Sequence, residues 1–308
     1  MGLFNWNKTK ETANVDIEGH PSAAVEIGST STSTVAAIVN PSDYFIKFGF
    51  PGQIHDLANR GEYISYYDRR TRNPLWVIEH ITKESLKNSN GNRENSVFKE
   101  DNSIPQTFRA KLTDYFRSGY DRGHQAPAAD AKYSQDAMDN TFYLSNMCPQ
   151  VGSGFNRDYW AHFEYFCRGL TRHYDSVRIV TGPLYLPKRD PDGKMRVTYE
   201  MIGNPPNVAV PTHFFKIIIG ESVKLGSRVA LGAFVLPNAP IDNNVPLKSF
   251  YVPLESVERS SGVEFLPNLP LSDRKDLCQE VKCEITVREF KNALPPPKER
   301  LALPAPKN

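Results

Sequence analysis

The sequence predicts an α+β fold in which a central antiparallel or mixed sheet is flanked by helices. Three apolar, β-branched segments of strand length occupy residues 177–186, 208–219 and 229–236. Apolar side chains recur at the spacing of an amphipathic helix from about residue 156 to residue 173. No internal repeat or linker interrupts these elements, so we expect one domain that contains both the sheet and its helices.

Composition is typical of a soluble globular protein. Of the 308 residues, 39% are hydrophobic and 23% are charged, and a chain of this length can bury a sizeable core. No apolar run approaches the roughly 18 to 20 residues of a membrane helix, so we expect no integral membrane segment. The net charge of +2 does not by itself predict nucleic-acid binding. Any phosphate-binding surface must therefore be a local basic patch.

Two tails are predicted on either side of the domain. Residues 1–40 contain the run GSTSTST at 28–34, which has no apolar period, and we expect this segment to be disordered. No apolar segment follows a basic start there, so neither a signal peptide nor another targeting segment is recognisable. The domain is assigned to residues 41–291. Residues 292–308 are rich in proline and are expected to form an extended tail.

The first half of the chain begins with a predicted hairpin. Aromatic and β-branched residues at 62–67 and 75–81 indicate two strands, and the polar connection 68–74, with three arginines, is typical of a solvated hairpin tip. Residues 85–102 are polar and predict a loop. Apolar residues spaced i, i+4, i+7 and i+8 within 108–120 predict a short amphipathic helix.

Shorter elements complete the prediction. We expect a helix or turn at 131–140, a strand at 141–146, helices at 252–259 and 272–280, and a late strand at 283–290. Ser272 is the expected N-cap of the second of these helices. The four cysteines are too few for a disulfide scaffold. Cys148 and Cys167 are expected to be buried free thiols. Cys278 and Cys283 are close enough in sequence to form a disulfide, and this alternative is left open.

Residues 118–127, SGYDRGHQAP, contain the most informative pair of side chains. If this stretch is extended, Arg122 and His124 project to the same face. A guanidinium binds phosphate as a fork, and a neutral imidazole accepts a proton near pH 7. Gly123 between them is expected to let a ligand approach the backbone. The pair suits attack on a phosphodiester, although most such short motifs are turn and surface residues.

A second stretch, FNRDYWAHFE at residues 155–164, offers oxygen ligands for a cation. On an α-helix, Asn156 and Glu164 lie about 80° apart and about 12 Å along the axis. Because helical side chains lean toward the N-terminus, Asn156 can be a direct ligand while Glu164 holds the waters of the ion. The alternative for Asn156 is a helix N-cap. Trp160, between them, is expected to be a core residue.

Together with YLSNMCPQ at 143–150 and VTGPLY at 180–185, these stretches resemble the sugar-nonspecific ββα-metal (His-Me finger) endonucleases, most closely their mitochondrial endonuclease G branch. The resemblance runs from roughly Tyr44 to Phe290. It implies that the sheet carries a ββα-metal motif. It also implies cleavage of DNA and RNA to 5′-phosphate ends, Mg²⁺ as cofactor with Mn²⁺ as substitute, a homodimer and a mitochondrial location.

The resemblance also assigns roles to residues. Asn156 is implied to be the single direct metal ligand, with Glu164 acting through water. An arginine at the position of Arg93 is implied to reach the scissile phosphate, although a solvated loop arginine is an open alternative.

We expect His124 to be the general base, Arg122 to stabilise the phosphate and Asn146 to support the site by hydrogen bonds. Asp121 is expected to make a structural hydrogen bond. Two rival hypotheses are a catalytically silent nucleic-acid-binding protein of the same fold and a metal-dependent phosphodiesterase for small substrates.

Overall fold

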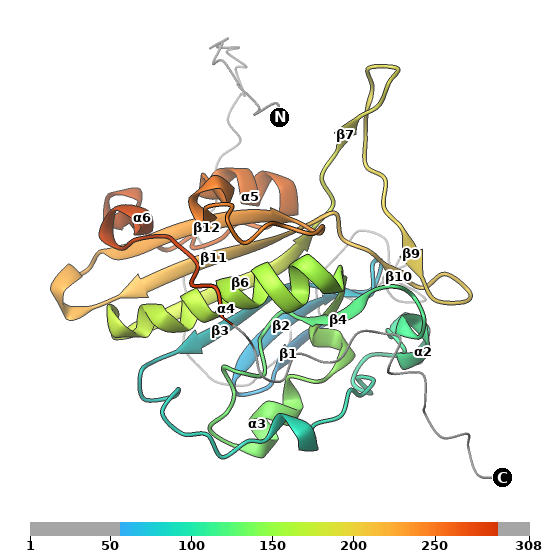
Figure 1. The fold of residues 1–308 in the computed structure, drawn as a ribbon, viewed down its shortest axis with the longest axis horizontal. Coiled ribbons are helices and arrows are strands. Elements are labelled where there is room, and N and C mark those ends of the chain that lie inside the picture. Colours follow the sequence, from blue (N-terminus) through green and yellow to red (C-terminus); the bar gives the residue numbers. More distant parts are fainter. Residues whose placement is uncertain (1–55, 289–308) are drawn as a thin grey trace, which may run out of the picture. The chain divides into compact units, whose positions relative to one another are not determined.

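The computed structural model describes residues 56–288, and its main feature is an eight-stranded sheet (Figure 1). Along the sheet the strands follow the order β1-β2-β3-β6-β11-β12-β13, with β14 beside β12. All pairs are antiparallel except β12 with β14. The strands are β1 Leu57–Asn59, β2 Tyr63–Asp68, β3 Asn73–Ile81, β6 Ser176–Leu184, β11 His213–Glu221, β12 Val229–Pro237, β13 Tyr251–Val252 and β14 Arg274–Asp276. The predicted α+β class with a central, mostly antiparallel sheet is confirmed.

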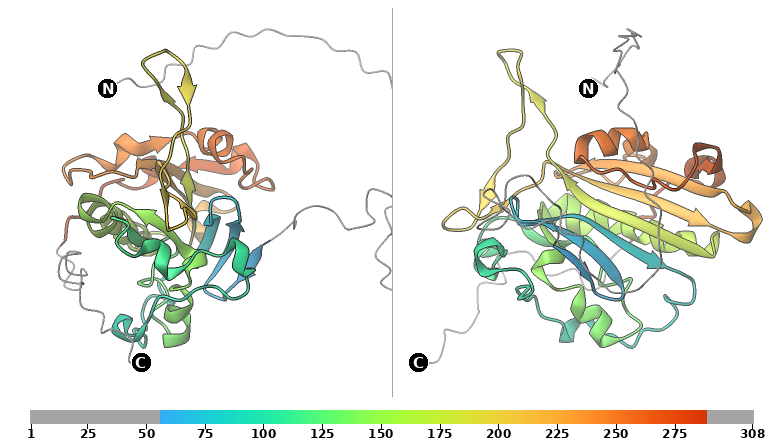
Figure 2. Two further views of the ribbon diagram at one scale, coloured as in Figure 1. Left: turned by 90° about the vertical axis from the view of Figure 1, so that its right-hand side faces the viewer. Right: turned by 180° about the vertical axis from the view of Figure 1, so that it is seen from behind.

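Both faces of the sheet are covered, which explains why its central strands are apolar without interruption. On β11, Phe214 and Ile218 join the core beneath α4 (Trp160–Gly169). Their neighbours Phe215 and Ile217 point the other way and pack with α5 (Leu254–Ser261). This alternation follows the two-residue period of a strand. In Figure 1, α4 runs in front of the sheet, and Figure 2 shows the layers from two further sides.

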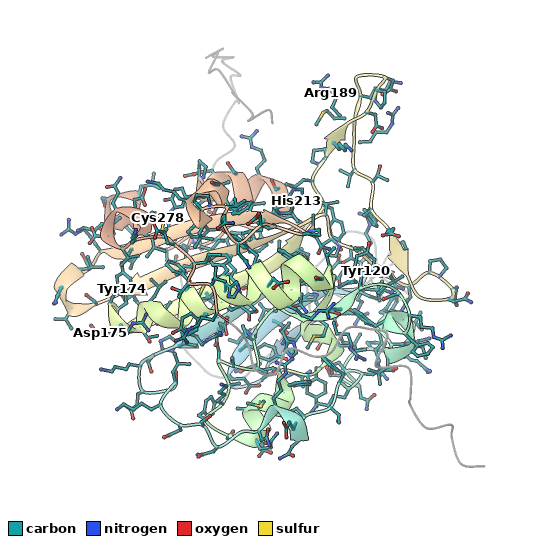
Figure 3. All side chains as sticks on the ribbon, in the orientation of Figure 1. Tyr120, Tyr174, Asp175, Arg189, His213 and Cys278 are labelled. Carbon is teal, nitrogen blue, oxygen red and sulfur yellow. A yellow bond between two sulfur atoms is a disulfide. The ribbon has the colours of Figure 1, made fainter. Side chains whose placement is uncertain are left out.

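The chain segment that connects β6 to β11 forms a two-stranded arm that projects from this body (Figure 2). Its strands are β7 (Lys188–Arg189) and β8 (Met195–Arg196), and Arg189 lies near its tip (Figure 3). At its base, β9 (Met201–Ile202) pairs with β10 (Val208–Ala209). The predicted single strand 208–219 is therefore two strands, since β10 leaves the main sheet and β11 joins it.

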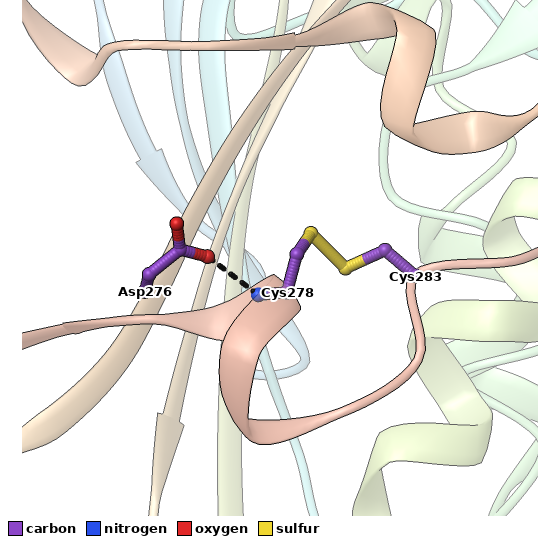
Figure 4. Close-up of a disulfide and its surroundings, with 3 residues drawn as sticks. All are labelled: Asp276, Cys278 and Cys283. Carbon is purple, nitrogen blue, oxygen red and sulfur yellow. Dashed lines mark hydrogen bonds between the residues drawn. A yellow bond between two sulfur atoms is a disulfide. The ribbon is translucent and has the colours of Figure 1, made fainter.

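Several local predictions are confirmed. The hairpin of β2 and β3 has its turn within the polar connection 68–74. The short helix α3 (Gln135–Asn140) is capped by Ser134, whose hydroxyl accepts the Ala137 N–H. Cys148 and Cys167 are buried free thiols. Cys278 and Cys283 form a disulfide beside α6 (Leu277–Glu280), as Figure 4 shows.

The helix expected at 108–120 is wrong in length. Only a 3₁₀ turn, Gln106–Phe108, and α2, Leu112–Tyr115, are helical. Arg117 and Gly119 have φ of 55° and 86°, and this left-handed backbone ends the helix. Tyr115 is buried, whereas Phe116 is 61% exposed, so the apolar spacing did not mark one buried face.

The strand expected at 141–146 is also wrong. Leu144–Asn146 is a 3₁₀ turn, and the strand β5 begins one residue later, at Met147. The side chain of Asn146 donates to the Thr141 carbonyl at 2.8 Å, which closes this segment on itself. An extended chain would separate these two groups.

Near the C-terminal end, the helix expected at 272–280 is mostly other structure. Leu271–Asp273 is a 3₁₀ turn, Arg274–Asp276 is strand β14, and only α6 is α-helical. Asp276, not Ser272, caps α6 through the Cys278 N–H at 2.7 Å (Figure 4). Residues 283–288 form no strand, and the rest of the expected late strand lies outside the described residues. Both predicted tails, 1–40 and 292–308, lie outside them too and stay predictions.

Candidate active site

The candidate site is built on a hairpin and the helical segment that follows it. Strand β4 (Asp121–His124) pairs antiparallel with β5 (Met147–Gln150), placing Asp121 opposite Gln150. A kinked segment, Gly152–Tyr159, in which Ser153 and Gly154 are not helical, then leads into α4. The chain around Arg122 and His124 is therefore extended, which is the condition under which the two side chains share a face. The two paired strands β4 and β5 and the helical segment that follows them therefore form the framework of the candidate site.

His124 lies in an aromatic pocket and is only 8% exposed. Its ring meets Phe142 edge-on at 4.9 Å between centroids, and Phe98 lies at 5.7 Å. Burial holds the pKa of His124 well below its ordinary value of 6.5, and the positive charges of Arg93 and Arg122 lower it further. Its Nε2 has no hydrogen-bond partner among residues 56–288. The imidazole is therefore neutral at pH 7 and able to accept a proton.

Two guanidinium groups are placed by the same aromatic rings. The Arg122 guanidinium carbon lies 4.1 Å from the centre of the Phe98 ring, and that of Arg93 lies 5.4 Å from the Phe142 ring. Phe98 and Phe142 pack together at 4.9 Å. Such cation–π contacts hold an arginine in place while leaving its charge intact. Both arginines are thus gathered around His124, from segments about thirty residues apart.

Helix α3 holds the loop that carries Arg93. Arg93 begins a short 3₁₀ turn, Arg93–Asn95, inside the polar segment predicted as a loop. The preceding Asn92 donates its N–H to the Gln135 side chain at 2.8 Å and accepts from the same amide at 3.2 Å. Gln135 also donates to Ser96 at 3.1 Å. Ser96 in turn donates to Asp139 at 2.6 Å, so two side chains of α3 hold the Arg93 turn, with Gln135 making most of the bonds.

Asn156 is oriented by Asp121. Its Nδ2 donates to Asp121 Oδ2 at 2.9 Å, and this carboxylate also pairs with Arg157 Nε at 3.0 Å. With the amide nitrogen committed, Oδ1 of Asn156 is the atom left for a ligand. The side chain makes no N-cap bond, so the capping alternative is excluded. Asp121 has the structural role that was expected. A Cβ at Gly152 would come within 2.9 Å of this carboxylate, which explains the glycine there.

The helix around Asn156 is wider than an α-helix. The Asn156 N–H bonds to the Val151 carbonyl at 2.9 Å, and the Trp160 N–H bonds to Phe155, each five residues earlier. Such π-type turns are frequent at functional sites. The separation of about 80° and 12 Å between Asn156 and Glu164 assumed a uniform α-helix, and these five-residue bonds depart from that geometry.

Glu164 lies half-buried on α4. Burial raises its pKa, Asp130 raises it further, and the positive charges of Lys216, Arg168 and Arg93 oppose this rise. The charge of Arg93 acts on both Glu164 and His124, so this arginine lies near α4 and near the hairpin. The structure thus brings together His124, Arg122, Arg93 and Glu164. Asn156 is hydrogen-bonded to Asp121, at the other end of β4 from His124.

Residues 41–272 match the family model of the DNA/RNA non-specific endonucleases. The chain belongs to this family. It is 64% identical over 276 residues to the mitochondrial nuclease of Saccharomyces cerevisiae, covering 85% of this chain and 84% of that protein. It is 48% identical over 223 residues to mitochondrial endonuclease G of Bos taurus, covering 72% and 73%.

A solved structure agrees with this assignment. The fold resembles that in a crystal structure of an EndoG/EndoGI complex, with a TM-score of 0.70, 47% identity, and coverage of 76% of this chain and 96% of that one. Family membership makes the protein a nuclease, a hydrolase acting on nucleic acids. The names of its relatives support a mitochondrial location by resemblance. Within residues 56–288, no helix combines the length and apolar character needed to cross a membrane.

Gly123 has a different role from the one expected, whereas Asn146 supports the site by hydrogen bonds, as expected. A Cβ at Gly123 would lie 2.0 Å from Gln150 Oε1, so this glycine makes room for a buried glutamine, not for a ligand. Asn146 is fully buried and bonds only to backbone: it accepts from the Ala126 N–H and donates to Ala126 and Thr141 carbonyls. It therefore positions the chain just after His124 and does not face substrate.

Sequence reasoning missed the aromatic residues of the endonuclease site. Phe98 and Phe142 were assigned to a loop and a strand, yet their rings hold Arg122, Arg93 and His124 together. Phe98 is the one phenylalanine in the polar segment 85–102, and this isolated aromatic residue could have indicated a packing role there. Trp160 is a core residue as expected, 1% exposed and packed on Phe163 and Phe214.

Proposed function

We propose that this DNA/RNA non-specific nuclease is a Mg²⁺-dependent endonuclease that hydrolyses phosphodiester bonds to 5′-phosphate ends, with His124 as general base. The observation that carries the proposal is a buried, neutral imidazole between two arginines that the aromatic rings hold in place. A base must be unprotonated, and a phosphate requires positive charge around it. Both conditions are met within one small region.

The residues around Asn156 fit a hard, strongly hydrated cation. The Asn156 amide nitrogen donates its hydrogen bond to Asp121, which leaves the amide oxygen to bind a metal ion. Oxygen is the ligand that Mg²⁺ prefers. Among the described residues, no three His, Cys, Asp or Glu side chains converge on one point. Mg²⁺ commonly keeps several waters and takes one or two protein ligands, so a single amide with Glu164 near its waters is sufficient. We expect Mn²⁺ to substitute.

The chain's own residues then divide the chemical work. His124 takes a proton from the attacking water, whose oxygen bonds to phosphorus while the bond to the 3′ oxygen breaks. Arg122 and Arg93 contact the non-bridging oxygens and stabilise their growing negative charge. The bound metal supplies positive charge at the phosphate and the leaving oxygen. Breaking this bond leaves the phosphate attached to the 5′ oxygen of the next nucleotide, which gives the 5′-phosphate end.

This arrangement explains how one site accepts both DNA and RNA. All the proposed contacts reach the phosphate or the attacking water, and contacts of this kind carry no base information. They do not depend on the 2′-hydroxyl either, which is the group that separates RNA from DNA. We therefore propose cleavage of single- and double-stranded substrates.

The test is cleavage of supercoiled plasmid and of a long RNA with Mg²⁺, with and without chelator. We expect both polymers to be cut at internal bonds only when metal is present, and Asn156→Ala to lose most of this activity at any Mg²⁺ concentration. An exposed-site control, Asn244→Ala, should cut like the parent. Binding without cleavage would support the silent nucleic-acid-binding protein instead. Activity on a small diester with none on either polymer would support the small-substrate phosphodiesterase.

We also propose that the nuclease is a homodimer, following the family resemblance. Sedimentation equilibrium at micromolar concentration measures this directly. A single species of twice the 34.8 kDa chain mass is expected, and a monomer across the range would contradict it.

A further inference from the structure

The arm between β6 and β11 is not explained by packing within this chain. Residues 187–198 run through β7, its turn and β8, and all of them are exposed except the half-buried Asp190. The arm projects from the body in both views of Figure 2. A two-stranded hairpin without a hydrophobic face is only marginally stable by itself. The side chains of the arm are therefore available for contact with another molecule.

The charges of the arm are mostly positive. Residues 188–196 hold four basic and two acidic side chains. Arg196 pairs with both acids, at 2.7 Å to Asp190 and 2.6 Å to Asp192. The other three basic residues form no ion pair within residues 56–288: Lys188, Arg189 and Lys194. The arm thus presents three positive charges that no carboxylate of the described chain neutralises.

These three charges are concentrated at the end of the arm. The turn is closed by two backbone bonds of 2.9 Å, from the Asp190 N–H to the Lys194 carbonyl and from the Gly193 N–H to the Asp190 carbonyl. Arg189 lies near the tip in Figure 3, and its guanidinium donates to the Gly193 carbonyl at 2.9 Å. Lys188 precedes it on β7. The cations are therefore held close together on a turn of defined shape.

The base of the arm rests on the hairpin that carries the candidate site. Ile202 of β9 and Met147 of β5 belong to one buried cluster, and Met147 is the residue that pairs with His124. The hydroxyl of Tyr120, which immediately precedes β4, donates to the carboxylate of Glu200 at the base of the arm. A long polymer bound at this hairpin therefore lies near the base of the arm.

A nucleic acid matches both the charge and the length of the arm. Five extended residues, from Leu186 to Pro191, reach roughly 16 Å. Duplex DNA carries about one negative charge per 1.7 Å of its axis, so an element of this length meets several phosphates. We propose that the arm is an accessory phosphate-binding element, in which Lys188, Arg189 and Lys194 contact the nucleic-acid backbone several nucleotides away from the bond that is cut. The proposal rests on the nuclease activity of the family and not on the metal or on His124.

A second copy of this chain is the other occupant to consider. Met195 and Val197 on the arm are 43% and 50% exposed and could pack against it. However, the centre of a protein interface is depleted of charged residues. The acids of the arm are already paired with Arg196, so the three cations would enter such an interface without partners from their own arm. Nucleic acid is therefore the favoured occupant, and association of the chain is an outcome of the test.

The test is the affinity for duplex DNA, measured by fluorescence anisotropy with chelator so that no cleavage occurs. The triple variant Lys188→Gln, Arg189→Gln, Lys194→Gln should bind at least tenfold more weakly than the parent at about 0.1 M salt, and its slope of log affinity against log salt should fall by about 2 to 3. Its melting temperature should be unchanged, because all three side chains are exposed.

A matched control removes the same charges at the other end of the sheet. Lys224 and Arg228 lie in the turn after β11, Lys83 follows β3, and all three are exposed and form no ion pair within the described residues. Changing these three to glutamine should leave the affinity and the slope close to those of the parent. The variant Lys188→Arg, Arg189→Lys, Lys194→Arg keeps the charges of the arm and should also bind like the parent.

A fluorophore on the arm gives a reading that leaves the three cations in place. Met195→Cys offers an accessible thiol, whereas Cys148 and Cys167 are buried and the other two cysteines form a disulfide. Emission from this label should change saturably as duplex DNA is added. The proposal is overturned if the label does not respond, if the triple glutamine variant binds with parental affinity and slope, or if the control loses as much affinity. Sedimentation equilibrium of the same variant decides the alternative: a lost dimer with parental DNA affinity would assign the arm to a second copy. Because binding is read without cleavage, failure of the proposed metal mechanism would leave these results unchanged.

Discussion

At the scale of single residues, the site depends on the protonation state of His124 and on the orientation of Asn156. Burial and two arginines keep the imidazole neutral, and Asp121 fixes the amide. Both effects come from neighbours and not from the two residues themselves. Substitutions at this scale should therefore change rate and pH dependence more than stability.

Removing the imidazole should remove the base. General-base catalysis contributes about 10² to 10⁴ in rate, so we expect His124→Gly to lose at least a hundredfold in kcat. The small residue leaves a hole beside Phe142, in which free imidazole can bind and accept the proton. Cleavage by the variant should recover with added imidazole and rise as that imidazole deprotonates. A variant that melts and binds DNA like the parent, yet cuts at the parental rate, would remove His124 from the mechanism.

The pH profile should report the charges around His124. Because its pKa is held well below 6.5, the acidic limb of kcat/KM should lie below pH 6.5. Arg93→Gln removes one of the causes, so this limb should move to higher pH, while the exposed Arg70→Gln should not move it. The lowered pKa of His124 also makes the free energy of unfolding depend on pH. The stability that goes with the neutral imidazole is complete above pH 6.5. It is lost as the pH falls below that value, because the unfolded chain then binds the proton first. An unmoved acidic limb in Arg93→Gln would contradict the assigned contact.

At the scale of elements, the site is a hairpin and a helix, completed by a loop from elsewhere. The loop with Arg93 has little regular structure of its own and is held by α3. The π-type turn at Gly152–Tyr159 displaces Asn156 from where a uniform helix would place it. The positions of these residues therefore depend on contacts between elements.

Gln135 offers a test of the connection between α3 and the Arg93 turn. It bonds twice to the Asn92 backbone and once to Ser96. We expect Gln135→Ala to reduce kcat about tenfold, or roughly 1.4 kcal/mol, because Arg93 loses its fixed position. Its neighbour Asp136 is exposed on the same helix, so Asp136→Ala serves as the control and should leave kcat unchanged. Equal rates for the two variants would show that α3 does not position Arg93.

At the scale of the whole molecule, attraction to nucleic acid cannot come from net charge, which is only +2. Local arginines must provide it. Binding by phosphate contacts releases counterions and carries no base information.

Affinity for DNA should therefore fall steeply with salt and vary little with sequence. Each phosphate contact adds about 0.9 to the slope of log affinity against log salt concentration. Arg122→Gln should reduce that slope by about one, as measured by fluorescence anisotropy on duplexes of unrelated sequence. A cleavage map confined to one short recognition site would contradict this view.

The sequence by itself determined what depends on local periodicity and spacing. The two-residue spacing put Arg122 and His124 on one face once the segment is extended, and apolar runs located β6, β12 and most of β11. Such patterns are local, because each strand or helix repeats within a few residues. The motifs that resembled a family identified the enzyme class for the same reason.

Only the tertiary structure decided the contacts between distant segments. Asn156 is oriented by an aspartate 35 residues earlier, and Gly123 is required by Gln150 on the neighbouring strand. The rings of Phe98 and Phe142 come from segments that no pattern joined. Asn146 turned an expected strand into a 3₁₀ turn through its own hydrogen bonds. The physical reason is that side-chain contacts across the fold override weak local propensity, and no window of adjacent residues contains them.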